Sequence, residues 1–202
     1  MDRSRNRLLA LVLMPVVLFL AACGVNSIPT AEENAKAKWA DVQASFQRRA
    51  NLIPNLVETT RAAAASEQAI LTGVTEARAN ATRITVSPEQ LSDPAAMARF
   101  SEAQSRLSAA IIPLQRLQEA YPNLQSQANF QTLMSQLEGT ENRINVAIRD
   151  YNEAVRGYNT EIRTFPSVIG ARVIYGSQPM VPYQAVTPGA EVAPTVNFGN
   201  AH

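Results

Sequence analysis

A seven-residue apolar repeat between residues 130 and 165 constrains the fold of this chain most strongly. One row of the repeat consists of Phe130, Leu137, Ile144, Tyr151, Tyr158 and Phe165, and a second row consists of Met134, Glu141, Ile148, Val155 and Ile162. Because every position except Glu141 is apolar, the repeat predicts a long amphipathic helix that packs against other helices in a left-handed supercoil. At 1.5 Å per residue this helix would be a rod of about 54 Å.

A first long helix is predicted over about residues 31–81. Apolar residues recur at steps of three and four from Trp39 to Val57, and the pattern resumes at Ile70 after a run of alanines. Pro54 lies inside this helix and removes the hydrogen bond to the carbonyl of residue 50. We therefore expect the first helix to be kinked or broken near Pro54.

A second long helix is predicted between Asp93 and Tyr121. Asp93 supplies a cap before Pro94 at the first helical position, and Tyr121 precedes Pro122, which disfavours further helix. The expected fold is thus an all-α antiparallel bundle of three long helices over residues 31–166. From residue 167 to residue 202 the chain is proline-rich and has no sustained period, which predicts an irregular, weakly ordered tail.

The N-terminal residues have the pattern of a secretion signal. Three arginines within the first seven residues precede an apolar run over residues 8–20, and Leu20-Ala21-Ala22 leads to Cys23, the one cysteine of the chain. Leu-Ala-Ala-Cys resembles the lipobox of bacterial lipoproteins. It implies a signal peptide over residues 1–22, acyl chains such as palmitate on Cys23, and a lipidated tether over residues 23–30. The alternative is an uncleaved anchor with a buried cysteine.

The composition offers little for catalysis. The net charge is +1, which gives no reason to expect a nucleic acid partner, and the single histidine is the C-terminal His202. No Ser-His-Asp or Cys-His pair can form in a core, no spacing suits zinc, and no glycine-rich phosphate loop is present. We therefore expect no catalytic residues, no metal and no cofactor.

Glu141 is the exception in the apolar repeat, and a carboxylate at such a position needs a partner. Arg48 and Arg49 lie beside the apolar face of the first helix, close to Pro54. Our hypothesis is that Glu141 pairs with one of these arginines and sets the register between the first and third long helices. The alternative is that local curvature turns Glu141 outward.

A row of asparagines borders the same repeat. Asn145, Asn152 and Asn159 are seven residues apart, each one position after a residue of the first row. Because an amide both donates and accepts hydrogen bonds, the row is suited to joining neighbouring helices or to docking another protein.

Several stretches of the chain together resemble the LemA family. They are Trp39, Gln47–Val57, Glu76–Ala79, Glu119–Leu124, Asn129–Phe130, Leu137–Ile144, Tyr151–Asn152, Tyr158–Asn159 and Thr164–Pro166. The resemblance implies an antiparallel helical bundle tethered to a bacterial envelope membrane. Two features depart from the family pattern: a lipobox stands where many members have an uncleaved membrane helix, and Asn51 stands where Asp is commoner.

These observations lead to one principal functional expectation and two alternatives. The principal expectation is a non-enzymatic envelope lipoprotein that acts as a scaffold or adaptor for membrane-associated proteins, with an envelope protein or a second copy as partner. The alternatives are a carboxylate-dependent enzyme that acts on envelope polymers and a regulator of a membrane protease. In a cell with two membranes, Gly24 after Cys23 predicts the outer membrane, with the protein facing the periplasm.

Overall fold

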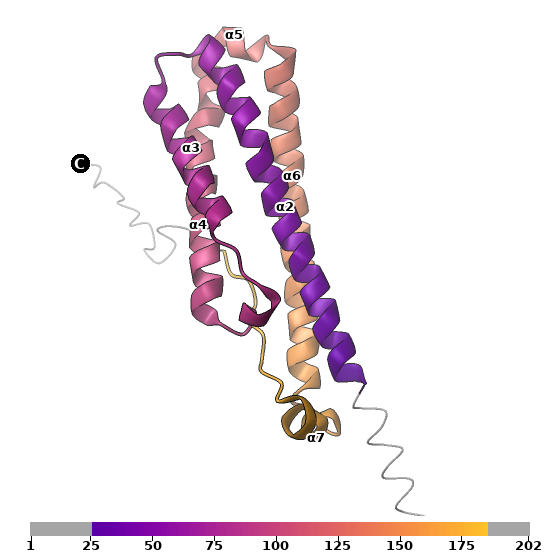
Figure 1. Cartoon of the computed structure of the whole chain (residues 1–202). Coiled ribbons are helices and arrows are strands. Elements are labelled where there is room, and N and C mark those ends of the chain that lie inside the picture. The colour runs from indigo at the N-terminus through magenta and orange to yellow at the C-terminus, as the bar shows by residue number, and fades with distance from the viewer. Residues whose placement is uncertain (1–25, 186–202) are drawn as a thin grey trace, which may run out of the picture.

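Four long antiparallel helices form the body of the molecule in a computed structural model that describes residues 26–185 (Figure 1). The long helices are α2 (Ser27–Ala63), α3 (Gln68–Arg83), α4 (Pro94–Ala120) and α6 (Ala128–Glu161). Short elements connect or follow them: η1 (Pro88–Gln90), α5 (Pro122–Gln125), α7 (Ser167–Gly170) and η2 (Ala171–Tyr175), a short π-helix. No strand occurs in the part of the chain that the structure describes, so the predicted all-α bundle is confirmed.

The first predicted helix is two helices, and the break is not at Pro54. Helix α2 continues through Pro54 to Ala63, and the chain turns between Ala64 and Glu67 before α3 begins. The phenol of Tyr121 holds this turn, since its Oη lies 3.0 Å from Ser66 Oγ and donates to Glu67 Oε1 at 2.8 Å. The prediction of three long helices is therefore wrong by one, because the alanine run and not the proline contains the turn.

Other boundaries agree more closely. Helix α4 spans the predicted residues, and the Asp93 side chain accepts a hydrogen bond from Ala95 N at 2.8 Å, as a helix cap does. Helix α2 begins at Ser27, four residues before the expected start of the bundle. Helix α6 ends at Glu161, so Phe165 lies beyond it and is 81% exposed. The prediction that Phe165 closes the apolar row is wrong.

The core consists of two apolar clusters along the bundle. One cluster lies toward the turns at residues 64–67 and 121–127 and contains Ile53, Leu107 and Leu137. The other lies toward the opposite end and contains Trp39 and Tyr151, whose rings are 5.0 Å apart. Helices α2 and α6 pack against each other along their lengths and line both clusters.

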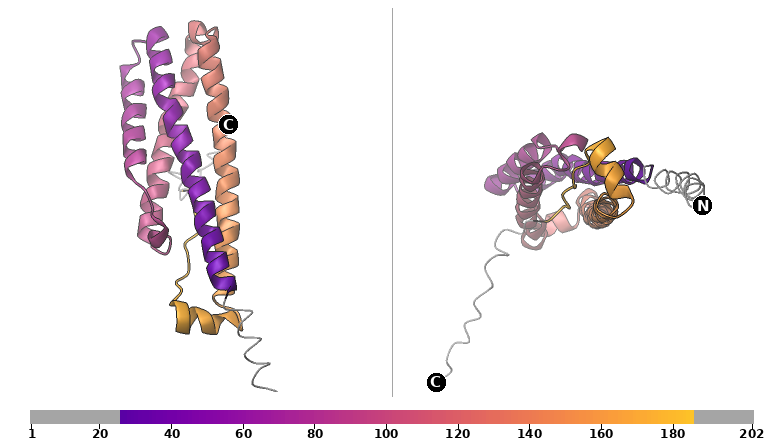
Figure 2. Two further views of the ribbon diagram at one scale, coloured as in Figure 1. Left: turned by 45° about the vertical axis from the view of Figure 1, so that its right-hand side comes forward. Right: turned by 90° about the horizontal axis from the view of Figure 1, so that it is seen from below.

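The segment after α6 does not behave as the expected loose tail. Residues 167–175 form α7 and η2 across the end of the bundle from which α2 starts, and residues 176–185 then run back along the bundle (Figure 2). The side chains of Met180 and Tyr183 in this return segment are buried. The prediction of weak order is therefore wrong for residues 167–185, although residues 176–185 are irregular in secondary structure as expected.

Candidate functional site

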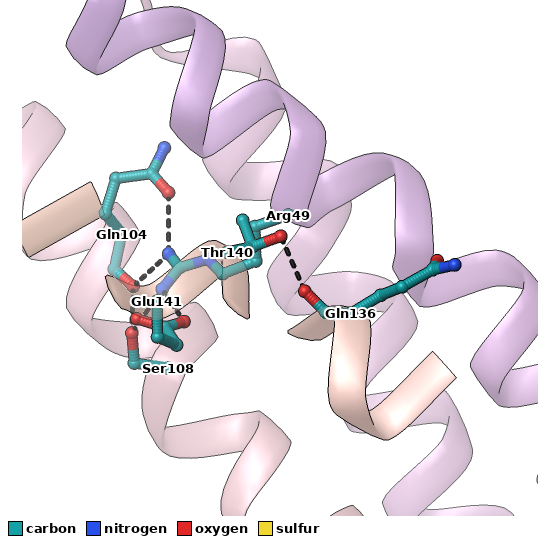
Figure 3. Close-up of polar contacts among 6 residues, drawn as sticks. All are labelled: Arg49, Gln104, Ser108, Gln136, Thr140 and Glu141. Atoms are coloured by element: carbon teal, nitrogen blue, oxygen red, sulfur yellow. Dashed lines mark hydrogen bonds and ion pairs between the residues drawn. The ribbon is translucent and has the colours of Figure 1, made fainter. Parts of the chain in front are cut away.

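A buried arginine joins the long helices between the two apolar clusters (Figure 3). Arg49 of α2 is 1% exposed. Its Nη1 donates to Ser108 Oγ and to Glu141 Oε1, each at 2.8 Å, and its Nη2 donates to Gln104 Oε1 at 2.9 Å. Gln104 in turn donates to the carbonyl of Ala81 at 3.3 Å. One guanidinium therefore connects α2 to α4 and α6 directly and to α3 through Gln104.

The predicted pairing of Glu141 is present in the structure, with Arg49 and not with Arg48. The burial is the reverse of what the sequence indicates, because the side chain of Glu141 is 42% exposed and that of Arg49 is 1% exposed. The Phe46 ring lies 5.1 Å from the Arg49 guanidinium carbon, and Arg49 Nε is buried without a hydrogen-bond partner. Arg48 is exposed. Of the two charged groups in this ion pair, Arg49 is therefore the one that is removed from water.

Pro54 remains inside α2 because another helix compensates for its missing N–H. A residue with an N–H at position 54 would bond the carbonyl of Ala50, and proline leaves that carbonyl without its donor. Arg78 of α3 supplies the donor: its Nε lies 2.7 Å from Ala50 O. The proline therefore marks a contact between α2 and α3 and not the end of a helix.

Asn152 and Asn159 both bind the main chain of the return segment, residues 176–185. Asn159 Nδ2 donates to Met180 O at 2.8 Å while its Oδ1 accepts from Met180 N at 2.9 Å. Asn152 repeats the arrangement with Tyr183, at 3.0 Å to the carbonyl and 2.8 Å from the amide nitrogen. Each side-chain amide thus pairs with both main-chain groups of one residue, as a neighbouring strand would.

The two spacings match because of chain geometry. Seven residues of helix rise about 10.5 Å, and three residues of extended or polyproline chain rise about 9–10 Å. Pro179 and Pro182 are also three residues apart, and each precedes a residue that an asparagine binds. Prolines have no N–H, so this register places both of them where no donor is required.

Further contacts hold the return segment between α6 and α4. Tyr151 Oη donates to Val181 O at 2.8 Å, Val181 N donates to Leu91 O at 2.8 Å, and Ser101 Oγ donates to Gln184 O. Burial raises the pKa of the Tyr151 phenol, which keeps this donor protonated at neutral pH.

Asn145 continues the asparagine row but is exposed and contacts no described part of the return segment. Beside the occupied part of the row lies an open groove of about 650 Å³ between α6 and the return segment. Arg156 and Arg163 line this groove, and no acidic residue does. Both arginines are exposed, so the groove offers positive charge next to an extended main chain.

Several of these contacts were not predicted from the sequence. Arg78 and Gln104 are surrounded by ordinary helical sequence. Nothing in that sequence indicates that Arg78 donates to the carbonyl left open by Pro54, or that Gln104 binds the guanidinium of Arg49. The prolines three residues apart, opposite asparagines seven residues apart, were a usable signal for the return segment. Cys23 lies outside the described residues.

The described residues offer neither a metal site nor a membrane-spanning helix. Within residues 26–185 no group of three or more His, Cys, Asp or Glu side chains is arranged to hold a metal ion. Among the same residues no helix combines the length and apolarity that a bilayer crossing requires.

Comparison with known proteins gives consistent results. The model of the LemA family matches residues 38–198, which include most of α2, all the later helices and the return segment. The chain is also 28% identical over 186 residues to magnetosome protein MamQ 2 and to magnetosome protein MamQ 1 of Paramagnetospirillum magneticum. Each alignment covers 80% of this chain and 66% of the relative, so the chain spans just under two thirds of the length of these relatives.

Proposed function

The chain belongs to the LemA family, and from this premise we propose that it is a lipid-anchored, non-enzymatic adaptor that docks an extended segment of another envelope protein along α6. Family membership and the similarity to the MamQ proteins support a membrane-associated, non-catalytic protein. The lipobox at Cys23 supports anchoring by acyl chains on the outer side of the cytoplasmic membrane, or in the outer membrane facing the periplasm where the cell has two membranes.

The groove beside the return segment is the observation that carries this proposal. Asn152 and Asn159 already bind a polypeptide main chain without regard to its side chains, which is the chemistry by which a protein recognises extended segments. The adjacent groove is unfilled in the bundle and is about 650 Å³ in volume. Arg156 and Arg163 give it a positive charge, so the segment that fits is extended and carries acidic side chains.

The experiment is site-specific photocrosslinking in living cells that express the full chain. The probe is placed at Arg156 and Arg163, which are exposed and line the groove, and at Asn145, which continues the row. Asn152 and Asn159 are left intact because they hold the return segment. Arg116 is the matched control, since it is an exposed arginine on α4 and does not line the groove.

The expected result is one envelope protein captured from the groove positions and not from Arg116, with the crosslinked peptide of the partner rich in Asp and Glu. Crosslinks between two copies of this chain from the same positions would assign the groove to self-association. Equal capture from Arg116 and from the groove positions would show that the groove is not a docking site. Either of these outcomes would refute the adaptor proposal.

A further inference from the structure

Large exposed apolar side chains gather at one end of the bundle. Over residues 165–175 four of them are more than half exposed: Phe165, Ile169, Val173 and Ile174, which are 81%, 57%, 78% and 62% exposed. The residues of the same stretch that face the bundle are small: Ser167, Gly170 and Ala171 are buried. The usual pattern of a surface helix is therefore inverted here, with small residues inside and large apolar residues outside. We call these four exposed side chains the apolar end.

The apolar end lies beside the start of α2. Ser27 Oγ donates to Glu161 Oε1 at 2.5 Å, and Ser167 Oγ donates to the same oxygen at 2.5 Å. The first residue of α2 and the first residue of α7 thus share one carboxylate at the end of α6, and both views of the ribbon place α7 across this end (Figures 1 and 2).

The few residues between Cys23 and Ser27 limit how far the lipid attachment point can lie from this end of the bundle. Cys23 precedes Ser27 by four residues, and four residues of extended chain span at most about 14 Å. Acyl chains on Cys23 would therefore hold the start of α2, and with it the apolar end, close to the membrane surface. The opposite end of the bundle, with the turns at residues 64–67 and 121–127, would then point away from the membrane.

The charge of this region suits a lipid surface. Between residues 162 and 185 the charged residues are Arg163 and Arg172, both basic and both exposed. Of the nearby carboxylates, that of Glu161 is turned toward the hydroxyls of Ser167 and Ser27, whose hydrogen bonds lower its pKa. Those of Glu32 and Glu89 line a pocket with Lys36 and Tyr175. An apolar surface flanked by cations is what the interface of a bilayer with anionic headgroups binds.

We propose that the apolar end inserts into the membrane interface, so that α7 and η2 form a second membrane contact beside the lipid on Cys23. The inference rests on the proposed lipid anchor, because the anchor brings this end to the bilayer. With two points of attachment the bundle stands at a fixed orientation on the membrane instead of swinging on its tether. The groove along α6 then opens at a defined height above the surface.

The test measures the depth of single labelled positions on the full lipidated chain, reconstituted in vesicles of phosphatidylethanolamine and phosphatidylglycerol. Ile169→Cys and Val173→Cys each carry an environment-sensitive fluorophore, and the thiol of Cys23 is consumed by the lipid. Ile112→Cys is the matched control, since Ile112 is also an exposed apolar residue, 47% exposed, on α4 toward the far end. Flotation of the vesicles reports anchoring, and quenching by spin-labelled lipids reports depth.

The expected result is that the protein floats with the vesicles, and that lipid-borne quenchers reduce the emission at positions 169 and 173 several-fold more than at position 112. Protein that floats but shows equal, weak quenching at all three positions would overturn the membrane contact and leave the lipid anchor standing. Protein that does not float would overturn the anchor and the contact together. In living cells, a photocrosslinking probe at Ile169 that captured an envelope protein, together with floated but unquenched protein in the vesicles, would identify the apolar end as a protein interface and would also overturn the inference.

Discussion

Replacing Asn152 by aspartate should weaken the attachment of the return segment to the bundle. The substitution preserves the shape of the side chain and the oxygen that accepts from Tyr183 N at 2.8 Å. It replaces the Nδ2 donor, 3.0 Å from Tyr183 O, by a second oxygen, so two acceptors face each other. The lost hydrogen bond and the unsatisfied carbonyl together should cost about 2–3 kcal/mol.

The readout is hydrogen exchange of the Tyr183 amide, which follows local opening of the segment. A cost of 2–3 kcal/mol corresponds to a loss of protection of roughly 30- to 150-fold. The defect should shrink at low pH, because a protonated carboxyl can donate to Tyr183 O. The facing carbonyl raises the pKa of the introduced carboxyl in the folded state, so stability falls as the pH rises past about 4.

The control is Asn145→Asp, the same substitution in the same row at an exposed position. It should change the free energy of unfolding by less than about 0.5 kcal/mol. The free energy of local opening, obtained from the protection of the Tyr183 amide, should change by no more than that. If Asn152→Asp left protection of the Tyr183 amide unchanged, the paired hydrogen bonds would not hold the segment. If both variants lowered it equally, the effect would come from charge and not from the lost donor.

Two further predictions concern the bundle. Arg78→Met should cost about 1–3 kcal/mol by leaving the Ala50 carbonyl without a donor, and this cost should largely disappear in a Pro54→Ala background, where the new N–H bonds that carbonyl. Urea unfolding of the four proteins in the cycle measures this, and equal costs in both backgrounds would contradict it. Burial raises the pKa of Tyr151 above its ordinary 10.0, so its contribution is complete below pH 10 and is lost as the pH rises further. Tyr151→Phe, which loses the bond to Val181 O, should show a smaller alkaline loss of stability than the parent, and parallel losses would refute the assignment.

Local sequence determined the buried face of α6 and the limits of α4. The apolar residues of the seven-residue rows from Phe130 to Ile162 are buried or partly buried, because helical periodicity fixes which side chains share a face without reference to the rest of the chain. Helix α4 likewise begins at Pro94 and ends at Ala120, since its cap and its terminating proline act within a few residues.

Only the tertiary structure decided how groups left open by the local sequence are satisfied. The sequence shows that Pro54 leaves the Ala50 carbonyl without a donor, but the donor, Arg78, comes from another helix. Whether Arg49 or Glu141 of the ion pair is desolvated depends on which side chain the neighbouring helices cover, and they cover Arg49.

The return segment shows most clearly that contacts between distant segments are not predictable from one segment alone. Residues 176–185 have no helical or strand period, so their own sequence predicts no packing. Their order comes from hydrogen bonds to Asn152 and Asn159, which lie on another element, 31 and 21 residues before the residues that they bind. A periodic pattern is a property of one segment and can be read from it, whereas complementarity between two segments exists only once the fold has brought them together.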